Sequence, residues 1–308
     1  MPKTKLPITA TETKFHGILA RIHSNRSSKY RVRMSSAVIK DLNDAGEEGQ
    51  YFAATCSHVN ETDEIDACAK KRLAWLKKMH KKGLRVKVAF LAGKPAGFLH
   101  LIPIEYSTWG PIGKDLMVLP CMYVLDKWKT KGLGKALLQA AEEETKKQGK
   151  KALVTYGYYG DFWFMPAKFF EKRGFSAVAR KKVTSEGEKD FLGDEAILWK
   201  LYDVTAKPPQ FLNRRFDFKP VEGKVVLDLF SNVFCKEIEA QRVREVVKEF
   251  GDKVILNEYP SENRSVLMQY QIFRAIFING KEIGWGCEAP REGIRKAIKE
   301  ALEDIKGS

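Results

Sequence analysis

Residues 122–138 read MYVLDKWKTKGLGKALL, and this stretch decides the fold that we predict for the chain. An apolar, strand-like run ends near Leu125, a short basic loop follows, and an amphipathic helix begins directly after the loop. Gly132 and Gly134 have no Cβ, so the backbone there can lie close against a ligand. The first N–H groups of the helix are unpaired and the helix dipole adds positive potential, so this turn suits a pyrophosphate.

Two common phosphate-binding patterns do not fit the loop. The nucleotide-binding P-loop requires Ser or Thr after its last lysine, whereas Lys135 is followed by Ala136. The dinucleotide-binding fingerprint requires a third glycine beyond Gly132 and Gly134, and the loop has none. A solvated basic turn without a ligand remains the alternative.

The loop resembles the Arg/Gln-x-x-Gly-x-Gly/Ala signature of the GNAT superfamily of acyl-CoA N-acyltransferases. Lys129 stands where the family usually has Arg or Gln, and both glycines match. The resemblance implies that the loop and helix start hold the pyrophosphate of coenzyme A, so that acetyl-CoA is the expected cofactor. The residues expected to bind it here are Lys129, Thr130, Lys131, Gly132, Leu133, Gly134 and Lys135.

The flanking sequence predicts the element order of such a domain. Residues 84–104 indicate two strands joined at Gly93, residues 116–125 a third strand, and apolar spacing after Leu133 a helix that ends at Gly149. A strand at 152–156 comes next, then a segment at 164–175 that resembles the short family helix ending in Glu-Lys-x-Gly-Phe. Alternating runs at 176–183 and 195–202 close the sheet. The resemblance covers roughly residues 50–203.

Composition limits the function classes. The chain has 308 residues, enough for two domains, with 44% hydrophobic residues. It shows no membrane-length apolar run and no secretory signal, and its five scattered cysteines suit a reducing cytoplasm. The net charge of +15 comes from dispersed lysines, so we expect attraction for an anionic cofactor rather than a nucleic-acid partner.

The predicted organisation has four parts. Residues 1–48 are an N-terminal extension of uncertain structure, 49–205 the acetyltransferase domain, 206–222 a linker marked by Pro208-Pro209, and 223–308 a smaller domain. The last part has strand patterns at 225–230 and 254–259 and helix patterns at 236–250 and 264–270. A hairpin through Asn279-Gly280 and a final helix after Pro290 complete it.

This βαβ(α)ββα order resembles a thioredoxin-like domain, and the whole arrangement resembles the YoaP-like proteins. The predicted fold class is therefore α/β, a GNAT mixed-sheet domain followed by a thioredoxin-like domain. Cys235 falls where that family has its first active-site cysteine, at a helix start that lowers a thiol pKa. Ile238 replaces the second cysteine and Arg274 the family's cis-proline. Cys287, in the loop after the last strand, is predicted to lie beside Cys235 as a thiol partner.

Catalysis requires a held thioester, a stabilised oxyanion and proton transfer. The resemblance implies that backbone N–H groups of Tyr123, Val124 and Leu125, on a strand that splays from its neighbour, meet the acyl and pantetheine groups. The family's usual acid, a tyrosine, is replaced by Phe170. The candidate substitutes are Tyr156, Tyr158 and Tyr159 at the end of the next strand, and Cys121 and Tyr123, which share a strand face.

The leading hypothesis is an N-acetyltransferase acting on a small-molecule amine or a protein or peptide acceptor, bound or positioned by the thioredoxin-like domain. Two alternatives stay open. One is a regulatory protein that binds coenzyme A with weak or lost catalysis, and the other a thiol-redox protein acting through Cys235. The spacing of Cys56, His58, Cys68 and His80 matches no familiar zinc set, so we expect no metal. The acceptor's identity, the acyl chain and the oligomeric state are left open.

Overall fold

The computed structural model describes residues 37–161, 164–183, 193–235, 237–284 and 289–307. These residues form two separate sheets, one of seven strands and one of four. None of the helices in this described part is both long and apolar enough to cross a membrane. Cys287 lies outside the described residues, so the predicted pairing with Cys235 stays a prediction.

The first sheet is mixed and has the strand order β1-β2-β3-β4-β5-β7-β6. Its β4 and β5 run parallel, whereas the other described neighbours run antiparallel. The strands are β1 Val38–Asp41, β2 Arg85–Leu91, β3 Lys94–Pro103, β4 Met117–Val124, β5 Ala152–Tyr158, β6 Ser176–Lys182 and β7 Asp194–Leu201.

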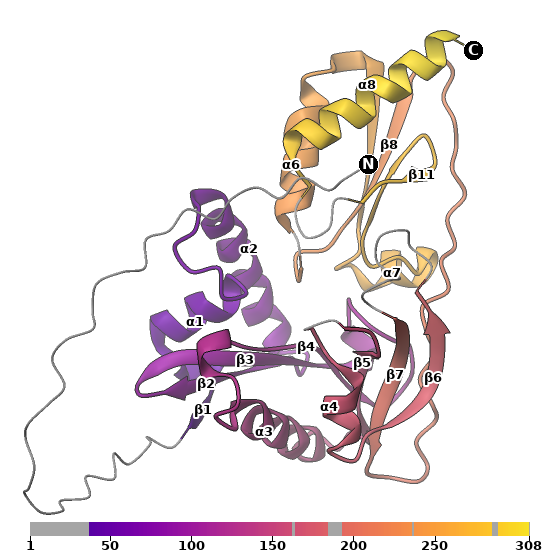
Figure 1. Cartoon of the computed structure of the whole chain (residues 1–308). Helices are drawn as coiled ribbons and strands as arrows, with labels where there is room; N and C mark the ends of the chain where they lie inside the picture. Colours follow the sequence, from indigo (N-terminus) through magenta and orange to yellow (C-terminus); the bar gives the residue numbers. More distant parts are fainter. Residues whose placement is uncertain (1–36, 162–163, 184–192, 236, 285–288, 308) are drawn as a thin grey trace, which may run out of the picture. The chain divides into compact units, whose positions relative to one another are not determined.

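Helices cover both faces of this sheet (Figure 1). Helices α1 (Gly46–Ala54) and α2 (Asp63–His80) bury Phe52 and Leu76 against one side, called here the α1/α2 face. Helices α3 (Leu133–Lys147) and α4 (Ala167–Glu171) bury Leu137 and Phe170 against the other, the α3 face. Each face therefore has its own core, and the strands of the sheet contribute alternate side chains to both.

Most elements lie where the sequence predicts them, but the sheet begins earlier than residue 49. All four residues of β1 pair with β2, and α1 begins at Gly46, within the residues assigned to the extension. A four-residue strand without apolar alternation carries little local signal, because its place is decided by pairing with the edge of β2. In contrast, α2 has a clear start, since the side chain of Thr62 accepts a hydrogen bond from Ile65 N.

The second sheet has the order β11-β10-β8-β9, with β8 parallel to β9 and antiparallel to β10. Helices α6 and α8 pack on one of its faces through Val243, Val246, Ile294 and Ile298. The bounds are β8 Val225–Ser231, α6 Glu237–Lys248, β9 Val254–Pro260, α7 Arg264–Tyr270, β10 Ala275–Ile278, β11 Lys281–Glu282 and α8 Arg291–Gly307.

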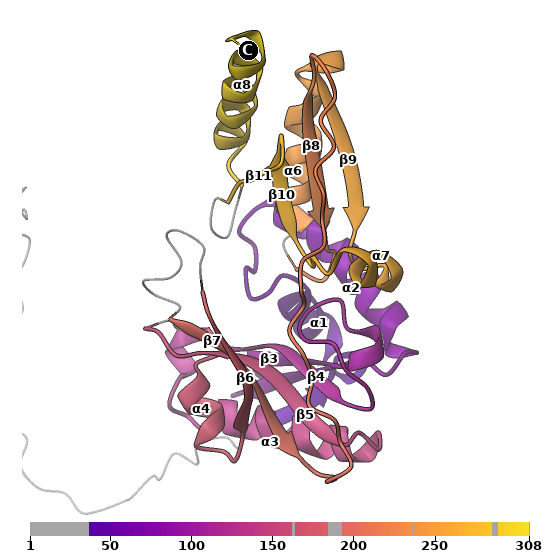
Figure 2. The same ribbon diagram turned by 90° about the vertical axis from the view of Figure 1, so that its right-hand side faces the viewer.

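Residues 211–221, called here the strap, lie along the other face of the second sheet (Figure 2). Arg215 N donates to Tyr270 O at 2.8 Å, and Asn213 N donates to the side-chain oxygen of Gln271 at 2.7 Å. The ring of Phe216 packs against the buried Phe230. A segment whose sequence indicates a linker is thus held in place by hydrogen bonds and aromatic packing.

Candidate active site

The parallel strands β4 and β5 separate partway along their length. They pair from Met117 to Leu119 with Leu153 to Thr155, although β4 continues to Val124 and β5 to Tyr158. Pro120 comes directly after the last pair and has no N–H to continue the ladder. The later part of β4 therefore presents backbone groups towards a gap beside β5, as predicted for an acyl-binding strand.

The register of β4 selects which N–H groups face this gap. Leu125 N already donates to Ala96 O of the neighbouring chain segment at 3.0 Å, so the predicted use of the Leu125 N–H is wrong. Hydrogen-bonded pairs alternate along an antiparallel ladder, which places the N–H of Tyr123 on the β3 side as well. The backbone N–H groups of Met122 and Val124 therefore point towards the gap.

The glycine loop forms a left-handed turn at the start of α3. Thr130 and Gly132 have φ values of 65° and 80°, and Gly132 is the N-cap. Ala136 N donates to Gly132 O at 3.0 Å, so the N–H groups of the three preceding residues lie ahead of the first helical bond. The local geometry therefore leaves N–H groups at the helix start without a helical acceptor, the feature that the sequence predicts for an anion site.

The two glycines of the loop differ in what surrounds them. A Cβ on Gly132 would meet nothing within 4 Å, whereas one on Gly134 would lie 3.3 Å from the ring of Phe169 in α4. Gly134 thus lets the aromatic ring approach the helix, a packing role that the sequence did not indicate. Among the loop lysines, Lys129 pairs with Asp126 at 2.6 Å, and Lys131 and Lys135 are exposed.

Three candidate catalytic side chains lie on the α1/α2 face beside the gap. Cys121 and Tyr123 of β4 both pack against that core, as expected, and Tyr156 of β5 packs against it too. The ring of Tyr156 stacks on Phe211 with centroids 5.7 Å apart. Burial, and then the charge of Glu195, raises the pKa of Tyr156 well above its ordinary value. Its phenol therefore stays protonated near neutral pH.

Of the remaining tyrosines, Tyr158 still acts electrostatically on Tyr156, whereas Tyr159 does not join this group. Tyr158 and Tyr159 pack against the core of the α3 face. The Tyr158 hydroxyl donates to Glu195 at 3.5 Å, and the Tyr159 hydroxyl donates to Glu171 at 2.5 Å. The predicted tyrosine cluster is therefore divided between two cores. Phe170 is fully buried in the α3-face core, where it can supply no proton.

A buried arginine on the α1/α2 face was not predicted as a site residue. Arg72 of α2 is only 7% exposed; its Nη1 donates to Cys56 Sγ, and its Nη2 lies 3.5 Å from His100 Nε2. The guanidinium also lies over the ring of Phe234, 5.2 Å from the centroid. Burial opposes its charge, but the thiols of Cys56, Cys235 and Cys121 outweigh that effect and raise the pKa of Arg72.

The neighbours of Arg72 offer it no carboxylate among the described residues. Burial, and then the charge of Arg72, lowers the pKa of His100 well below its ordinary value, so the imidazole is neutral. Burial, and then the neighbouring Cys56, raises the pKa of the Cys121 thiol. In the described part of the chain, Arg72 Nε and His100 Nδ1 have no hydrogen-bond partner. The sequence signal was present: Arg72 lies on the apolar stripe of its helix, and His100 in an apolar strand.

The predicted thiol and metal candidates are placed as follows. Cys235 lies two residues before α6, and its N–H donates to Asn232 O at 3.1 Å. Arg274 pairs with Glu239 at 3.3 Å. No group of three or more His, Cys, Asp or Glu side chains that could hold a metal occurs among the residues described.

Comparisons with known proteins identify the class of one domain of the chain. Residues 82–177 match the family model of the acetyltransferase (GNAT) domain, which confirms an acetyltransferase domain in this chain. Acetyl-CoA is the cofactor of that family. None of the curated proteins matches the sequence significantly.

Several solved structures are similar to part of the chain. An N-acetyltransferase from Staphylococcus aureus is 19% identical over 54% of this chain and 99% of its own, with a TM-score of 0.41. The PaiA N-acetyltransferase from Thermoplasma acidophilum, in complex with coenzyme A, is 19% identical over 54% and 99%, with a TM-score of 0.33. YncA from Salmonella typhimurium, with acetyl-CoA, is 19% identical over 56% and 97%, with a TM-score of 0.40.

Proposed function

We propose that the protein is an acetyl-CoA-dependent N-acetyltransferase whose acceptor is an amine on a small molecule or a peptide. The observation that carries the proposal is the separation of β4 from β5 after Leu119, in the strand that leads to the glycine turn at the start of α3. The turn suits the pyrophosphate, and the gap offers the N–H of Val124 to a carbonyl oxygen. The matched acetyltransferase domain spans both features.

Bound acetyl-CoA would supply the acetyl thioester. The chain would orient the cofactor and donate a proton to the departing thiolate. The N–H groups at the start of α3, which lie ahead of its first helical hydrogen bond, with the ammonium groups of Lys131 and Lys135, would hold the phosphates. Tyr156 flanks the gap from β5 and keeps its proton, so it suits the general acid that protonates the departing thiolate. The neutral amine nitrogen would bond to the acetyl carbon as the carbon–sulfur bond breaks, the proton lost by the nitrogen would pass to solvent, and solvent would return a proton to Tyr156.

The cofactor site is tested by a matched pair of glycine substitutions. Gly132 and Gly149 flank opposite ends of α3, both have positive φ, and neither would place a Cβ within 4 Å of another atom. Gly132→Ala should lower acetyl-CoA affinity about 10-fold in calorimetry, because it strains the turn that presents the N–H groups. Gly149→Ala has the same backbone strain and should leave the affinity unchanged. Equal affinities would contradict the site.

Activity is tested by release of free coenzyme A thiol with a panel of amines and peptides. Tyr156→Phe should reduce the turnover rate about 100-fold with little change in KM. Tyr159→Phe removes a hydroxyl that is bonded to Glu171 instead, so it is the control. If acetyl-CoA binds but no amine or peptide causes release of coenzyme A, the regulatory coenzyme A-binding protein is favoured. If acetyl-CoA does not bind, both the acetyltransferase and the regulatory protein are excluded.

The second sheet supports a proposal for the remainder of the chain. We propose that residues 223–308 form a thioredoxin-like domain of the YoaP-like kind, joined by residues 206–222 to the acetyltransferase domain, whose sheet begins with β1 at Val38. The supports are the sheet order, the parallel β8–β9 pair, and a separate core between this sheet and α6 and α8. A fragment starting at residue 210, which retains the strap, should unfold cooperatively in denaturant if this is right.

Thiol chemistry is the second candidate function, and it is favoured because Cys56, Cys121 and Cys235 all pack against the α1/α2-face core, where Arg72 Nη1 donates to Cys56 Sγ. With a low-molecular-weight disulfide as oxidant, one cysteine thiolate would displace a thiolate and form a mixed disulfide. A second cysteine would then displace the other half and close a protein disulfide. Peptide mapping after incubation with glutathione disulfide tests this. Only mixed disulfides, or none, would leave the acetyltransferase as the sole candidate.

A further inference from the structure

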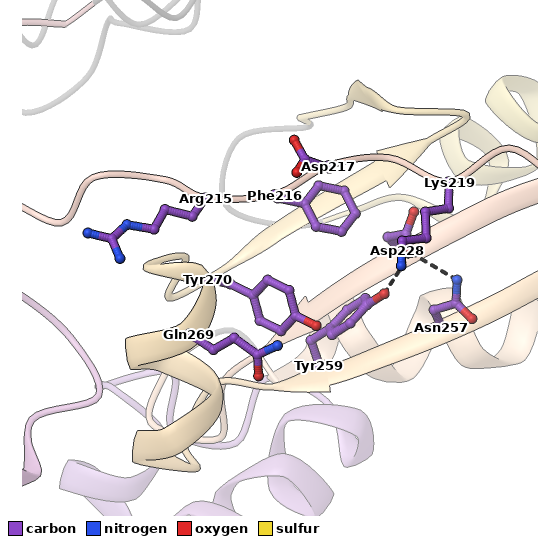
Figure 3. A pocket seen from close by; sticks show the side chains of 9 residues that line it. All are labelled: Arg215, Phe216, Asp217, Lys219, Asp228, Asn257, Tyr259, Gln269 and Tyr270. Atoms are coloured by element: carbon purple, nitrogen blue, oxygen red, sulfur yellow. Dashed lines mark hydrogen bonds between the residues drawn. The ribbon is translucent and has the colours of Figure 1, made fainter.

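A pocket of about 360 Å³ lies between the strap and the second sheet, on the face opposite α6 and α8 (Figure 3). Its walls come from the strap, β8, β9 and α7, so it belongs wholly to this part of the chain. Neither the glycine turn of α3 nor the gap beside β4 contributes to it. The acetyltransferase chemistry leaves this pocket unexplained.

A buried carboxylate lies at one side of the pocket. Asp228 is 2% exposed and occupies the middle of β8, in the otherwise apolar run VVLDLF. Its Oδ1 accepts hydrogen bonds from Asn257 Nδ2 at 3.0 Å and from the Tyr259 hydroxyl at 3.2 Å, as Figure 3 shows. Its Oδ2 is buried and has no hydrogen-bond partner in the described residues. One oxygen is therefore fixed, and the other is a buried acceptor whose hydrogen-bonding capacity is unused.

Two basic side chains of the strap share the pocket with Asp228. No ion pair to Asp228 occurs among the described residues, although Lys219 and Arg215 of the strap line the pocket. In Figure 3, the guanidinium of Arg215 points away from Asp228, at the far end of the pocket. A buried carboxylate without a counter-charge is costly, and a cationic ligand would remove that cost.

Aromatic rings form the rest of the wall. Tyr259 and Tyr270 meet edge to face with centroids 5.1 Å apart, and Phe216 meets Tyr259 at 5.9 Å and 72°. Ring faces attract cations, and their apolar surface suits an alkyl chain. Burial, and then the charge of Asp228, raises the pKa of Tyr259 to about 12, so its hydroxyl stays a donor to the carboxylate. Carboxylate and rings thus favour the same kind of ligand.

We propose that this pocket binds a primary alkylammonium group, with an N–H donated to Asp228 Oδ2 and the alkyl chain against Phe216 and Tyr270. A primary ammonium fits better than a quaternary one, because Oδ2 requires a hydrogen-bond donor. The group could belong to a free amine or to a lysine side chain of a peptide, and the test separates these sources. The proposal does not depend on acetyl transfer.

The test titrates the full-length protein with butylammonium chloride, followed by calorimetry or by NMR shifts of the aromatic protons. A dissociation constant of about 1 mM is expected for so small a ligand. Asp228→Asn keeps the shape and removes the charge, so it should weaken binding at least ~10-fold. Asp217→Asn neutralises a strap carboxylate that lines the same pocket, and it should bind as the wild type does. The melting temperature of each variant establishes that it is folded.

Further probes make the proposal falsifiable. Butanol and tetramethylammonium should bind more weakly than butylammonium, and equal binding of either would overturn the ammonium hydrogen bond. Lys219→Met removes a competing cation and should leave butylammonium binding equal or tighter. A loss of binding in that variant would overturn the proposal, because it would show that the lysine attracts an anion. A lysine-containing peptide that competes with butylammonium would extend the ligand to proteins; binding of free amines alone would restrict it to small molecules.

Discussion

The two faces of the first sheet differ in how their buried polar groups are satisfied. On the α3 face, the buried Lys87 pairs with Glu144 at 2.9 Å and with Asp41 at 2.7 Å, within an apolar core. On the α1/α2 face, the buried Arg72 meets thiols and an imidazole instead of a carboxylate. The first arrangement serves stability. The second leaves polar atoms without partners, which is common at sites where stability is exchanged for chemistry.

This difference teaches where to look for function in the fold. The α3 face carries the glycine turn, whose binding groups are backbone N–H groups at a helix start and need little support from afar. The α1/α2 face brings together Cys56, Arg72, His100, Cys121 and Phe234, which lie far apart along the chain. Its chemistry depends on tertiary packing, and the following substitutions test the contrast.

The largest effect is expected from Leu137→Ala in α3. Leu137 is fully buried in the α3-face core, so truncation should lower the free energy of unfolding by about 3 kcal/mol through lost burial and a residual cavity. Chemical denaturation measures this change. Gln139→Ala, at an exposed position of the same helix, should change it by less than about 0.5 kcal/mol. Similar values for the two variants would show that α3 does not anchor this face.

A smaller, pH-dependent effect is expected from Glu144→Gln. Burial opposes ionisation of Glu144, but hydrogen bonds from Lys87 and Gln148 outweigh it and lower its pKa from 4.5. Its stabilising contribution is therefore complete above pH 4.5 and is lost as the pH falls through the lowered folded value. At pH 7 the variant should lose about 2 kcal/mol, less than for an isolated buried pair because Lys87 keeps Asp41.

Denaturation at pH 7 and at acidic pH checks this prediction. The difference in stability between Glu144→Gln and the wild type should shrink on acidification. A difference that is constant with pH would show that the ion pair between Glu144 and Lys87 does not stabilise the fold.

Charge reversal in the turn should act on the cofactor rather than on the fold. Lys135→Glu places a negative charge in the first turn of α3 and should weaken acetyl-CoA binding about fivefold, and less at high salt. Lys147→Glu makes the same change in the last turn, remote from the glycines, and should leave the affinity unaltered. Calorimetry at two salt concentrations compares them. Equal weakening by both would indicate a general charge effect.

The smallest change in stability is expected from Arg72→Met. Replacing a buried charge that has no carboxylate partner by an apolar side chain of similar length should change the free energy of unfolding by less than about 1 kcal/mol, or raise it. Chemical denaturation measures this change in stability. The coenzyme A release assay measures the activity of the same variant. A loss of several kcal/mol would mean that the thiols satisfy the guanidinium fully, and the contrast between the two faces would disappear.

Much of the acetyltransferase domain could be predicted because its signals are local. The hairpin of β2 and β3, the apolar stripe of α3 and the turn at Gly132 each depend on residues close in sequence. The missed β1 and the wrong donor at Leu125 both depend on strand pairing, since pairing decides which N–H groups are used. The tyrosine cluster failed for a related reason, because packing divides Tyr156 from Tyr159 between two cores.

The sequence by itself determined most elements after α1, their order, and the helix start at Gly132, because hydrophobic period, glycine and helix capping act over a few residues. Tertiary structure alone decided that Arg72 meets Cys56 and His100, and that Asp228 lies beside Phe216 of the strap. Arg72, His100 and Asp228 stand out in the sequence as single polar residues in apolar segments. The sequence alone does not show which residue each of them contacts. Burial and strand register assign that partner, since both arise from contacts between segments distant along the chain.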